Sequence, residues 1–522
     1  MSQPLAATEP GGDIKALAAG GRTNFFGFLI RLAARLPFLF VAGRIYGADA
    51  LGRFALATIT VEFAAQLATL GLKRGLAQQL SHTDRPHVHV VWDAMLLGLL
   101  GSIVAAAVLI ALPRLMFPNS AIYGLDWLLP LTIFGWALSD IALAALAYRG
   151  DVAATVKARA IVEPWTISIA ALALSWYSLR DGLILAYVLS TIAAFTASIV
   201  PLIRSYGRPA GWRPEPVRLA KIANRNIPLA GADAIEWGSR RLDIYILGRF
   251  FLPDIVGIYY VAQQVASLPQ KLKTSFDPIL GPVITQNLEE GNKTAVAKQV
   301  RQVGFWIIAA QVGIALALGI PGEAVMGLVG PTFVGGTAAL AFLLAAEAIA
   351  ATAAVSESAL IYVARWRNLA ISLLMIAVQV IVSIALIYGL REAVPVLRSW
   401  GLPARIPADV RNDPISAAGV AIGLMVALGF ASVLKSRLLA KRLGARVSGW
   451  RWPIVWAAAA AALVGSGVVL LPEWLELAVG VLAILAAYGS VIWIKGFTQE
   501  DRALFRMGKQ DPPAPLAAPA AT

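Results

Sequence analysis

The sequence predicts an all-α polytopic membrane protein with about fourteen transmembrane helices, built as two six-helix lobes and two additional C-terminal helices. Three observations predict this fold: the composition, the spacing of apolar stretches and an internal repeat. Of 522 residues, 58% are hydrophobic and 14% are charged, and the mean hydropathy is +0.72. Soluble globular chains carry about 25% charged residues, so this chain has too little polar surface to face water on all sides.

Apolar stretches long enough to cross a bilayer, which takes about 20 residues, recur along the whole chain. In order they cover 24–46, 54–72, 90–112, 125–147, 160–178, 182–203, 227–247, 256–285, 303–321, 332–363, 369–390, 416–434, 453–471 and 477–494. They predict a cytoplasmic N-terminal tail, a first lobe, a basic linker, a second lobe, a basic loop, a last helix pair and a disordered tail. These parts cover 1–23, 24–203, 204–226, 227–434, 435–452, 453–495 and 496–522.

The distribution of positive charge predicts the orientation. Of the 44 Lys and Arg residues, 29 lie on the side of the N-terminus, nine on the opposite side and six inside apolar segments. Positively charged loops stay in the cytoplasm, so both termini are expected there. The net charge of +14 is therefore mostly explained by topology, and no nucleic-acid partner is expected. The six cations inside apolar segments are Arg31, Arg35, Arg240, Arg241, Lys271 and Lys273.

Several classes of chemistry have no residues to support them. The chain contains no Cys, which excludes disulfides and thiolate catalysis. Its three His residues share one cytoplasmic loop, where a solvated loop is expected and not a metal site. The sequence also lacks a GxxxxGK(S/T) motif for ATP hydrolysis. We expect a carrier without cofactors, driven by the membrane potential and, as an open alternative, by H⁺ or Na⁺.

The chain repeats itself at an offset of 205 residues, so that residues 35–57 align with 240–262 without a gap. The identical pairs are Arg35/Arg240, Gly43/Gly248, Arg44/Arg249, Asp49/Asp254, Gly52/Gly257 and Ala57/Ala262. The offset maps six segments onto six, so both lobes have the same orientation and are related by an axis along the membrane normal. This symmetry favours a transporter with its site between the lobes; a duplication retained only for folding is the alternative.

The repeated pattern (A/G)R-(I/F)-(Y/F)-x-x-D-x-(L/V)-G-x-(F/Y) resembles the multidrug/oligosaccharidyl-lipid/polysaccharide (MOP) flippase superfamily. The stretch 43–80, which includes LGLKRGL, is most similar to its polysaccharide-biosynthesis (Wzx-type) branch. This resemblance implies MATE-like lobes in a bacterial inner membrane. It also implies a flippase that moves an undecaprenyl-pyrophosphate-linked oligosaccharide to the periplasmic leaflet for O-antigen, exopolysaccharide or capsule synthesis. The implied partners are the lipid-linked glycan, membrane lipids and other polysaccharide-assembly proteins.

Polar residues inside the apolar segments predict a cavity between the lobes. A charge at mid-bilayer costs at least about 2.5 kcal/mol, so such residues normally face water or a partner. In the first segment, Arg31 and Arg35 share a helix face with Asn24, and that helix carries no carboxylate for them. Arginine suits pyrophosphate because its planar fork donates two hydrogen bonds. The predicted substrate-binding residues are Arg31, Arg35, Arg240, Lys271, Lys273, Asn24, Gln66, Gln263 and Gln270.

A second group of charges is predicted to gate the cavity or couple an ion. It comprises Glu62, Asp233, Glu236, Arg241, Asp243, Asp140, Glu347 and Glu357. In segment 227–247 the spacing of Glu236 and Arg240 also allows an ion pair within one helix. Two interpretations therefore stay open for this segment. Its charges could neutralise one another in ion pairs that only stabilise the fold, or they could bind substrate.

Three other functions are compatible with parts of the sequence. A lipid II flippase for peptidoglycan would share the cationic cavity. A MATE-type multidrug exporter would favour an acidic cavity, which the cations of the first segment oppose. A membrane glycosyltransferase or polymerase would be expected to carry a large outside loop, whereas the longest outside loop here covers only 391–415.

The absence of native Cys allows a direct test of the topology. Single cysteines at Ala50 and Val394 are expected to react with an impermeant thiol reagent added outside, whereas a cysteine at His82 is expected to react only after permeabilisation. The reverse pattern of labelling would contradict the orientation.

Overall fold

The structure is a computed structural model, and it describes residues 36–83, 85–399, 414–499 and 501–504. Helices form the regular structure throughout these ranges, and no β-strand occurs in them. The N-terminal lobe begins with a helix over 36–41 and the π-helical turn η1 (Ala42–Tyr46). It continues with α2 (Gly47–Ala68), α3 (Leu72–Ser81), α4 (His87–Ala111), α5 (Thr132–Tyr148), α6 (Val152–Thr155), η4 (Val156–Val162), α7 (Glu163–Leu174) and α8 (Gly182–Tyr206).

The C-terminal lobe is built from longer helices, and two final spans pack against it. The lobe comprises α9 (Pro216–Ser239), α10 (Leu242–Phe250), α11 (Pro253–Glu289), α12 (Lys293–Gly319), α13 (Gly322–Val329), η5 (Pro331–Gly336), α14 (Thr337–Ala351), α15 (Ala354–Val363), α16 (Arg365–Ser399) and α17 (Pro414–Leu443). The last part comprises α18 (Pro453–Val468), α19 (Glu473–Leu475), η7 (Glu476–Gly480), α20 (Val481–Val491), η8 (Ile492–Gly496) and η9 (Asp501–Leu504).

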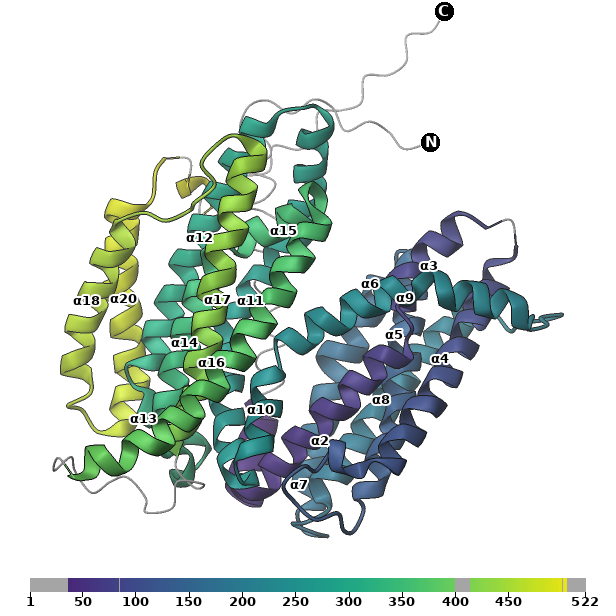
Figure 1. Cartoon of the computed structure of the whole chain (residues 1–522), viewed down its shortest axis with the longest axis horizontal. Helices are drawn as coiled ribbons and strands as arrows, with labels where there is room; N and C mark the ends of the chain where they lie inside the picture. The colour runs from purple at the N-terminus through teal and green to yellow at the C-terminus, as the bar shows by residue number, and fades with distance from the viewer. Residues whose placement is uncertain (1–35, 84, 400–413, 500, 505–522) are drawn as a thin grey trace, which may run out of the picture.

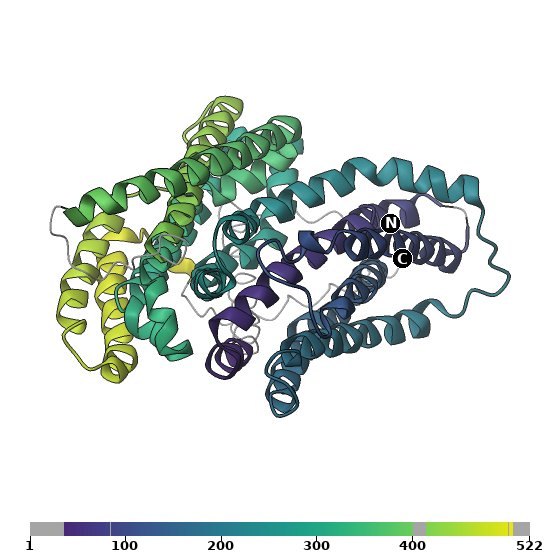
Figure 2. The same cartoon turned by 60° about the horizontal axis from the view of Figure 1, so that its bottom comes forward.

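The two lobes meet at one end and diverge toward the other, which gives the molecule a V shape (Figures 1 and 2). One continuous hydrophobic core joins α2 of the first lobe to α10, α11 and α14 of the second. At the divergent end the lobes have separate cores, one between α3, α4 and α5 and the other between α12, α15 and α17. The V opens at the end that carries the basic loops, and the positive-inside rule predicts that this end is the cytoplasmic one.

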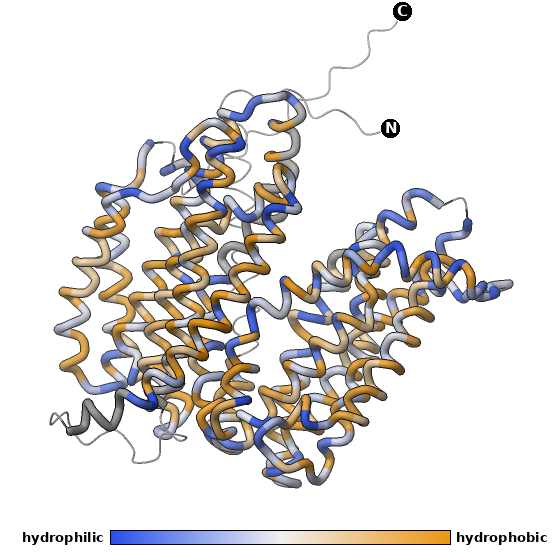
Figure 3. The backbone as a smooth tube through the Cα atoms, in the orientation of Figure 1, coloured by the Kyte–Doolittle hydropathy of each residue, from blue (hydrophilic) through white to orange (hydrophobic). Residues whose placement is uncertain are grey.

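The helices are apolar along most of their length, and hydrophilic residues gather near their ends (Figure 3). Within the described ranges, nine helices are long and apolar enough to cross a membrane, and α15 and α18 are shorter apolar helices. The chain is therefore a multi-pass membrane protein, as predicted, whereas the number of fourteen spans stays a prediction. The stretch counted as one span over Leu36–Ser81 turns sharply at Gly47, where φ is +84°.

Four predicted boundaries differ from the structure. The predicted span 332–363 is two helices, because α14 ends at Ala351 and α15 begins at Ala354. Helix α9 begins inside the predicted linker 204–226, and α17 extends into the predicted loop 435–452. Residues of the predicted disordered tail up to 504 are instead docked on the C-terminal lobe, whereas 505–522 lie outside the described residues.

This docking depends on Asp501, which is fully buried. Its carboxylate forms an ion pair with Arg451 at 2.6 Å and accepts hydrogen bonds from Gln302, Trp306 and Thr498. Burial alone would raise the pKa of Asp501, but the hydrogen bonds from Arg451 and Thr498 outweigh it and lower this pKa below its usual value.

The lobes touch where two glycines of the internal repeat face each other. A Cβ atom on Gly52 of α2 would lie 1.7 Å from the carbonyl oxygen of Pro253, and one on Gly257 of α11 would lie 2.0 Å from that of Ala48. The two helices therefore pack backbone to backbone, which only glycine permits. We call this contact the glycine crossing. The other repeated glycine pair also lies between the lobes, because Gly43 contacts Val329 and Gly248 contacts Leu56.

The glycine crossing predicts that Gly52→Ala lowers the thermal unfolding midpoint of the purified protein. The added methyl group meets backbone, which cannot move aside as a side chain could, and such overpacking costs about 1–3 kcal/mol. Gly231→Ala on α9 is the matched control, because no atom lies within 4 Å of its added Cβ. Equal midpoints for both variants would contradict the crossing.

Candidate functional site

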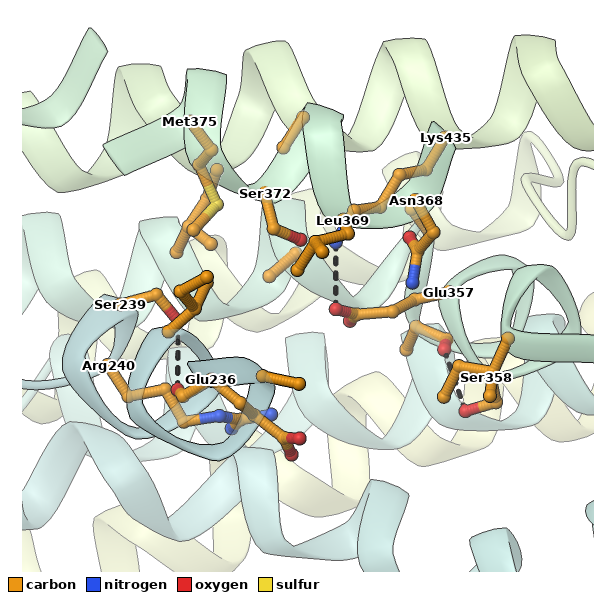
Figure 4. A pocket seen from close by; sticks show the side chains of 18 of the residues that line it. Glu236, Ser239, Arg240, Glu357, Ser358, Asn368, Leu369, Ser372, Met375 and Lys435 are labelled. Atoms are coloured by element: carbon orange, nitrogen blue, oxygen red, sulfur yellow. Dashed lines mark hydrogen bonds and ion pairs between the residues drawn. The ribbon is translucent and has the colours of Figure 1, made fainter. Parts of the chain in front are cut away.

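A cavity of about 930 Å³ lies between the lobes and is open on one side. Its walls are formed by α3, α9 and the Arg240–Arg241 break from one side, and by α11 and α14 to α17 from the other. Figure 4 shows residues of α9 facing residues of α15, α16 and α17 across this space. Helix α9 leads into the C-terminal lobe but is joined to α3 of the N-terminal lobe by the ion pair of Arg74 and Asp233, so the cavity lies between the two lobes.

Positive charge dominates the described lining. Six cationic and three acidic side chains line the cavity. The cations are Arg74, Arg225, Arg240, Arg241, Arg365 and Lys435, and the acids are Glu236, Glu347 and Glu357. The interior of a membrane protein disfavours unbalanced charge, so an excess of cations here is suited to an anionic ligand.

Arg74 connects α3 to α9 through two ion pairs. Its guanidinium lies 2.7 Å from Asp233, which is buried, and 2.6 Å from the exposed Glu236. Gly71 and Gly75 allow this approach, since a Cβ on either would meet α9 within 3 Å. The sequence-based alternative that paired Glu236 with Arg240 is therefore wrong, because Glu236 forms its ion pair with Arg74.

Two further cations of the lining are also paired. Arg241 contacts Glu62 of the N-terminal lobe at 3.1 Å, so this pair bridges the two lobes. Lys435 of α17 contacts Glu357 of α15 at 2.7 Å (Figure 4). Glu62 also accepts a hydrogen bond from Tyr187 at 3.4 Å.

The remaining three cations of the lining form no ion pair with a described carboxylate. Among the residues that the structure describes, no carboxylate pairs with Arg225, Arg240 or Arg365. Arg240 stands at the end of α9, where the helix terminates at Ser239, and its side chain is exposed to the cavity. These three guanidinium groups can donate hydrogen bonds to a ligand without first breaking an ion pair.

The structure places the predicted site residues in three groups. Seven of them line the cavity: Arg240, Gln263, Gln270, Glu236, Arg241, Glu347 and Glu357. Asn24, Arg31 and Arg35 lie outside the described residues. Lys271 and Lys273 lie on α11, and their side chains are outside the described part of the chain.

Gln66, predicted to bind substrate, and Asp140, predicted to gate the cavity or couple an ion, are both buried inside the N-terminal lobe and do not line the cavity. Asp140 pairs with Arg159 and, at 3.3 Å, with Lys73, and it accepts a hydrogen bond from Gln66. Arg159 also pairs with Glu163. Gln66 of α2 and Lys73 of α3 are thus directed at the buried carboxylate of their own lobe, which needs cations nearby.

Asp243 is fully buried at the start of α10 and does not face the cavity directly. Its carboxylate accepts hydrogen bonds from the hydroxyl of Tyr259 at 3.0 Å and from the side-chain amide of Gln263 at 2.9 Å. It therefore contacts the cavity lining through the side chain of Gln263. Across the described ranges, no group of three or more His, Asp or Glu side chains could hold a metal ion.

Sequence reasoning missed four cavity cations. Arg74, Arg225, Arg365 and Lys435 follow or precede apolar segments, and by that position they predict only the topology. The one available signal was the LGLKRGL stretch, in which two glycines flank Arg74 at helical spacing. A charge at the edge of an apolar segment can set the topology, line the cavity or do both, and only the tertiary contacts distinguish these roles.

The paired and unpaired arginines predict different phenotypes. Arg74→Gln is expected to lower the thermal unfolding midpoint, because it removes the cation that pairs with the buried Asp233. Arg225→Gln should leave the midpoint unchanged and lower ligand affinity instead. Thermal unfolding of the two purified variants checks this, and equal destabilisation would contradict the distinction.

Comparisons with known proteins agree with this geometry. The model of a family described as "Polysaccharide biosynthesis protein" matches residues 41–318, which is more than half of the chain. No curated protein matches it in sequence. Solved structures do share its fold, and because three of them are only 11% to 13% identical in sequence, they are informative about the fold alone.

One similar structure is an inward-facing multidrug resistance MATE family transporter of the MOP superfamily, with 13% identity and a TM-score of 0.60 over 80% of this chain and 98% of that chain. Another is the lipid II flippase MurJ in an inward closed conformation, with 11% identity and a TM-score of 0.59 over 91% of this chain and 97% of that chain. A MOP superfamily transporter from Pyrococcus furiosus has 12% identity and a TM-score of 0.54 over 84% of this chain and 99% of that chain.

The family match confirms the predicted polysaccharide-biosynthesis branch, and the solved structures share the two-lobed fold predicted from the resemblance to MOP flippases. The chain belongs to the polysaccharide biosynthesis protein family and has the two-lobed fold of MOP superfamily transporters.

Proposed function

We propose that this protein is a flippase for an isoprenoid-pyrophosphate-linked oligosaccharide in cell-surface polysaccharide synthesis. The observation that carries this proposal is the cationic cavity between the lobes of a polysaccharide biosynthesis family member. Its three unpaired arginines suit a pyrophosphate, because each guanidinium donates two parallel hydrogen bonds to phosphate oxygens. Arg31 and Arg35 are proposed to extend this positive surface on the first helix.

The rest of the lining suits a glycan. Beside the arginines, polar uncharged side chains line the cavity from α11, α15 and α16, including Gln263, Gln264, Ser267, Ser358 and Asn368. Amides and hydroxyls both donate and accept hydrogen bonds, as sugar hydroxyls do. A ligand with an anionic end and a polar sugar would therefore find partners for both parts in this single space.

The membrane potential would drive transport in the outward direction. Moving one charge across 100 mV is worth about 2.3 kcal/mol, so a pyrophosphate with about two negative charges gains roughly 5 kcal/mol on leaving a negative cytoplasm. The cavity opens toward the predicted cytoplasmic side, where the substrate would enter. This mechanism places the protein in the bacterial inner membrane with both termini in the cytoplasm. Coupling to H⁺ or Na⁺ would add to the free energy that drives transport, but the membrane potential alone is sufficient by this estimate.

The proposal predicts that Arg240→Ala strongly reduces polysaccharide export by a strain that lacks the native gene, while the amount of membrane-inserted protein stays unchanged. Arg31→Ala and Arg35→Ala are expected to have the same effect. Arg240→Lys should retain part of the activity, because it keeps the charge but loses the bidentate donor. The measurement is surface polysaccharide per unit of protein in the membrane. Normal export by Arg240→Ala would refute the cavity assignment.

The same strain background separates the rival substrates. Restored polysaccharide with no rescue of a lipid II flipping defect supports the proposal. Rescue of the lipid II defect alone would favour a peptidoglycan precursor. Resistance to cationic drugs would favour an exporter, although the excess of positive charge in the cavity opposes cationic ligands.

A further inference from the structure

Three polar side chains of the C-terminal lobe form a hydrogen-bonded unit beside the cavity. Asp243 of α10 is fully buried, Tyr259 of α11 is 1% exposed, and Gln263 of α11 reaches the cavity lining. The Gln263 Nε2 atom lies 2.9 Å from both carboxylate oxygens of Asp243, and the Tyr259 hydroxyl donates to one of them at 3.0 Å. We call these residues the C-lobe triad.

The internal repeat shows that helix packing does not require this triad. At the offset of 205 residues, the equivalent positions in the N-terminal lobe are Phe38, Phe54 and Thr58. There the two phenylalanine rings contact each other with centroids 5.6 Å apart, and the Thr58 hydroxyl donates to a carbonyl of its own helix. The same scaffold thus folds with an apolar pair where the other lobe carries a buried carboxylate and a phenol.

The buried carboxylate fixes the orientation of the glutamine amide. Within the described residues no Lys or Arg pairs with Asp243, so it depends on hydrogen-bond donors for stabilisation. An ionised carboxylate only accepts hydrogen bonds, so the NH₂ group of Gln263 must face it. The same Nε2 atom also lies 3.5 Å from the carbonyl oxygen of Arg240. Both amide hydrogens are therefore directed into the protein, and the carbonyl oxygen of Gln263 is left for the cavity.

We propose that Asp243 is a positioning residue that holds Gln263 as a hydrogen-bond acceptor for a sugar hydroxyl of the transported lipid. This inference rests on the proposed function and deepens it. A deprotonated phosphate oxygen cannot donate a hydrogen bond, so the Gln263 carbonyl does not suit the pyrophosphate. The adjacent Arg240 guanidinium suits the pyrophosphate, because it donates hydrogen bonds. The substrate therefore binds with its pyrophosphate at Arg240 and its first sugar at Gln263.

Two synthetic probes separate these two contacts on the purified full-length protein. One is a polyprenyl pyrophosphate that carries a single hexose, and the other is the same lipid without a sugar. The wild-type protein is expected to bind the glycosylated lipid more tightly. Gln263→Met should lose this sugar-dependent increment, roughly threefold to tenfold in affinity for one hydrogen bond, and keep its affinity for the bare lipid. Arg240→Ala should lose affinity for both lipids.

The positioning role is tested by a reciprocal swap. Asp243→Asn introduces a donor that lets the Gln263 amide rotate, so the sugar increment should fall although the thermal midpoint stays equal or rises on removal of a buried charge. Combining Asp243→Asn with Gln263→Glu returns an acceptor to the cavity, because the new amide donates to the new carboxylate. This double substitution should restore the increment. A purely structural role would lower the thermal midpoint and leave the increment intact.

The outcomes distinguish the inference from the proposed function. Loss of binding in Arg240→Ala, together with a wild-type sugar increment in Gln263→Met and Asp243→Asn, would overturn the inference alone. Equal affinity of the wild-type protein for the two lipids would also overturn it. Undiminished binding of both lipids by Arg240→Ala would instead overturn the proposed function.

Discussion

The structure depends on one contact, the glycine crossing of α2 and α11, where Gly52 and Gly257 bring two helix backbones together. Around this contact a single hydrophobic core joins the lobes at one end. Toward the other end the helices diverge and the core divides, so the polar cavity can exist only where the lobes no longer touch (Figure 1). The repeat supplies both glycines, which explains why this motif occurs once in each lobe.

The cavity separates its positive charges by task. Arg74, Arg241 and Lys435 are paired with carboxylates and hold α3, α9, α15 and α17 in place across the space. Arg225, Arg240 and Arg365 pair with no carboxylate in the described part of the chain, and we propose that they bind the ligand. Charge in a membrane is costly unless it is paired or meets water, so both arrangements are physically consistent with a water-filled cavity. The pairs maintain the shape of the cavity, and the unpaired arginines provide its chemistry.

The predicted substrate-binding residues that line the cavity share one property, because Arg240, Gln263 and Gln270 are polar groups in the middle of apolar segments. Such residues stand out in a sequence because lipid does not tolerate them. Gln66 and Asp140 have the same property but are buried within their own lobe by Lys73 and Arg159. Periodicity identifies a polar helix face, but it does not distinguish a face directed at a neighbouring helix from one directed at a cavity.

The sequence alone determined that the chain is a helical membrane protein, that its halves are duplicated, and which superfamily it resembles. These properties follow from composition, periodicity and local motifs, which are readable along one chain. Tertiary structure decided which charges are paired, because partners such as Arg74 and Asp233 are more than 150 residues apart. It also decided the surroundings of Asp243, since the donors that hold this carboxylate come from another helix.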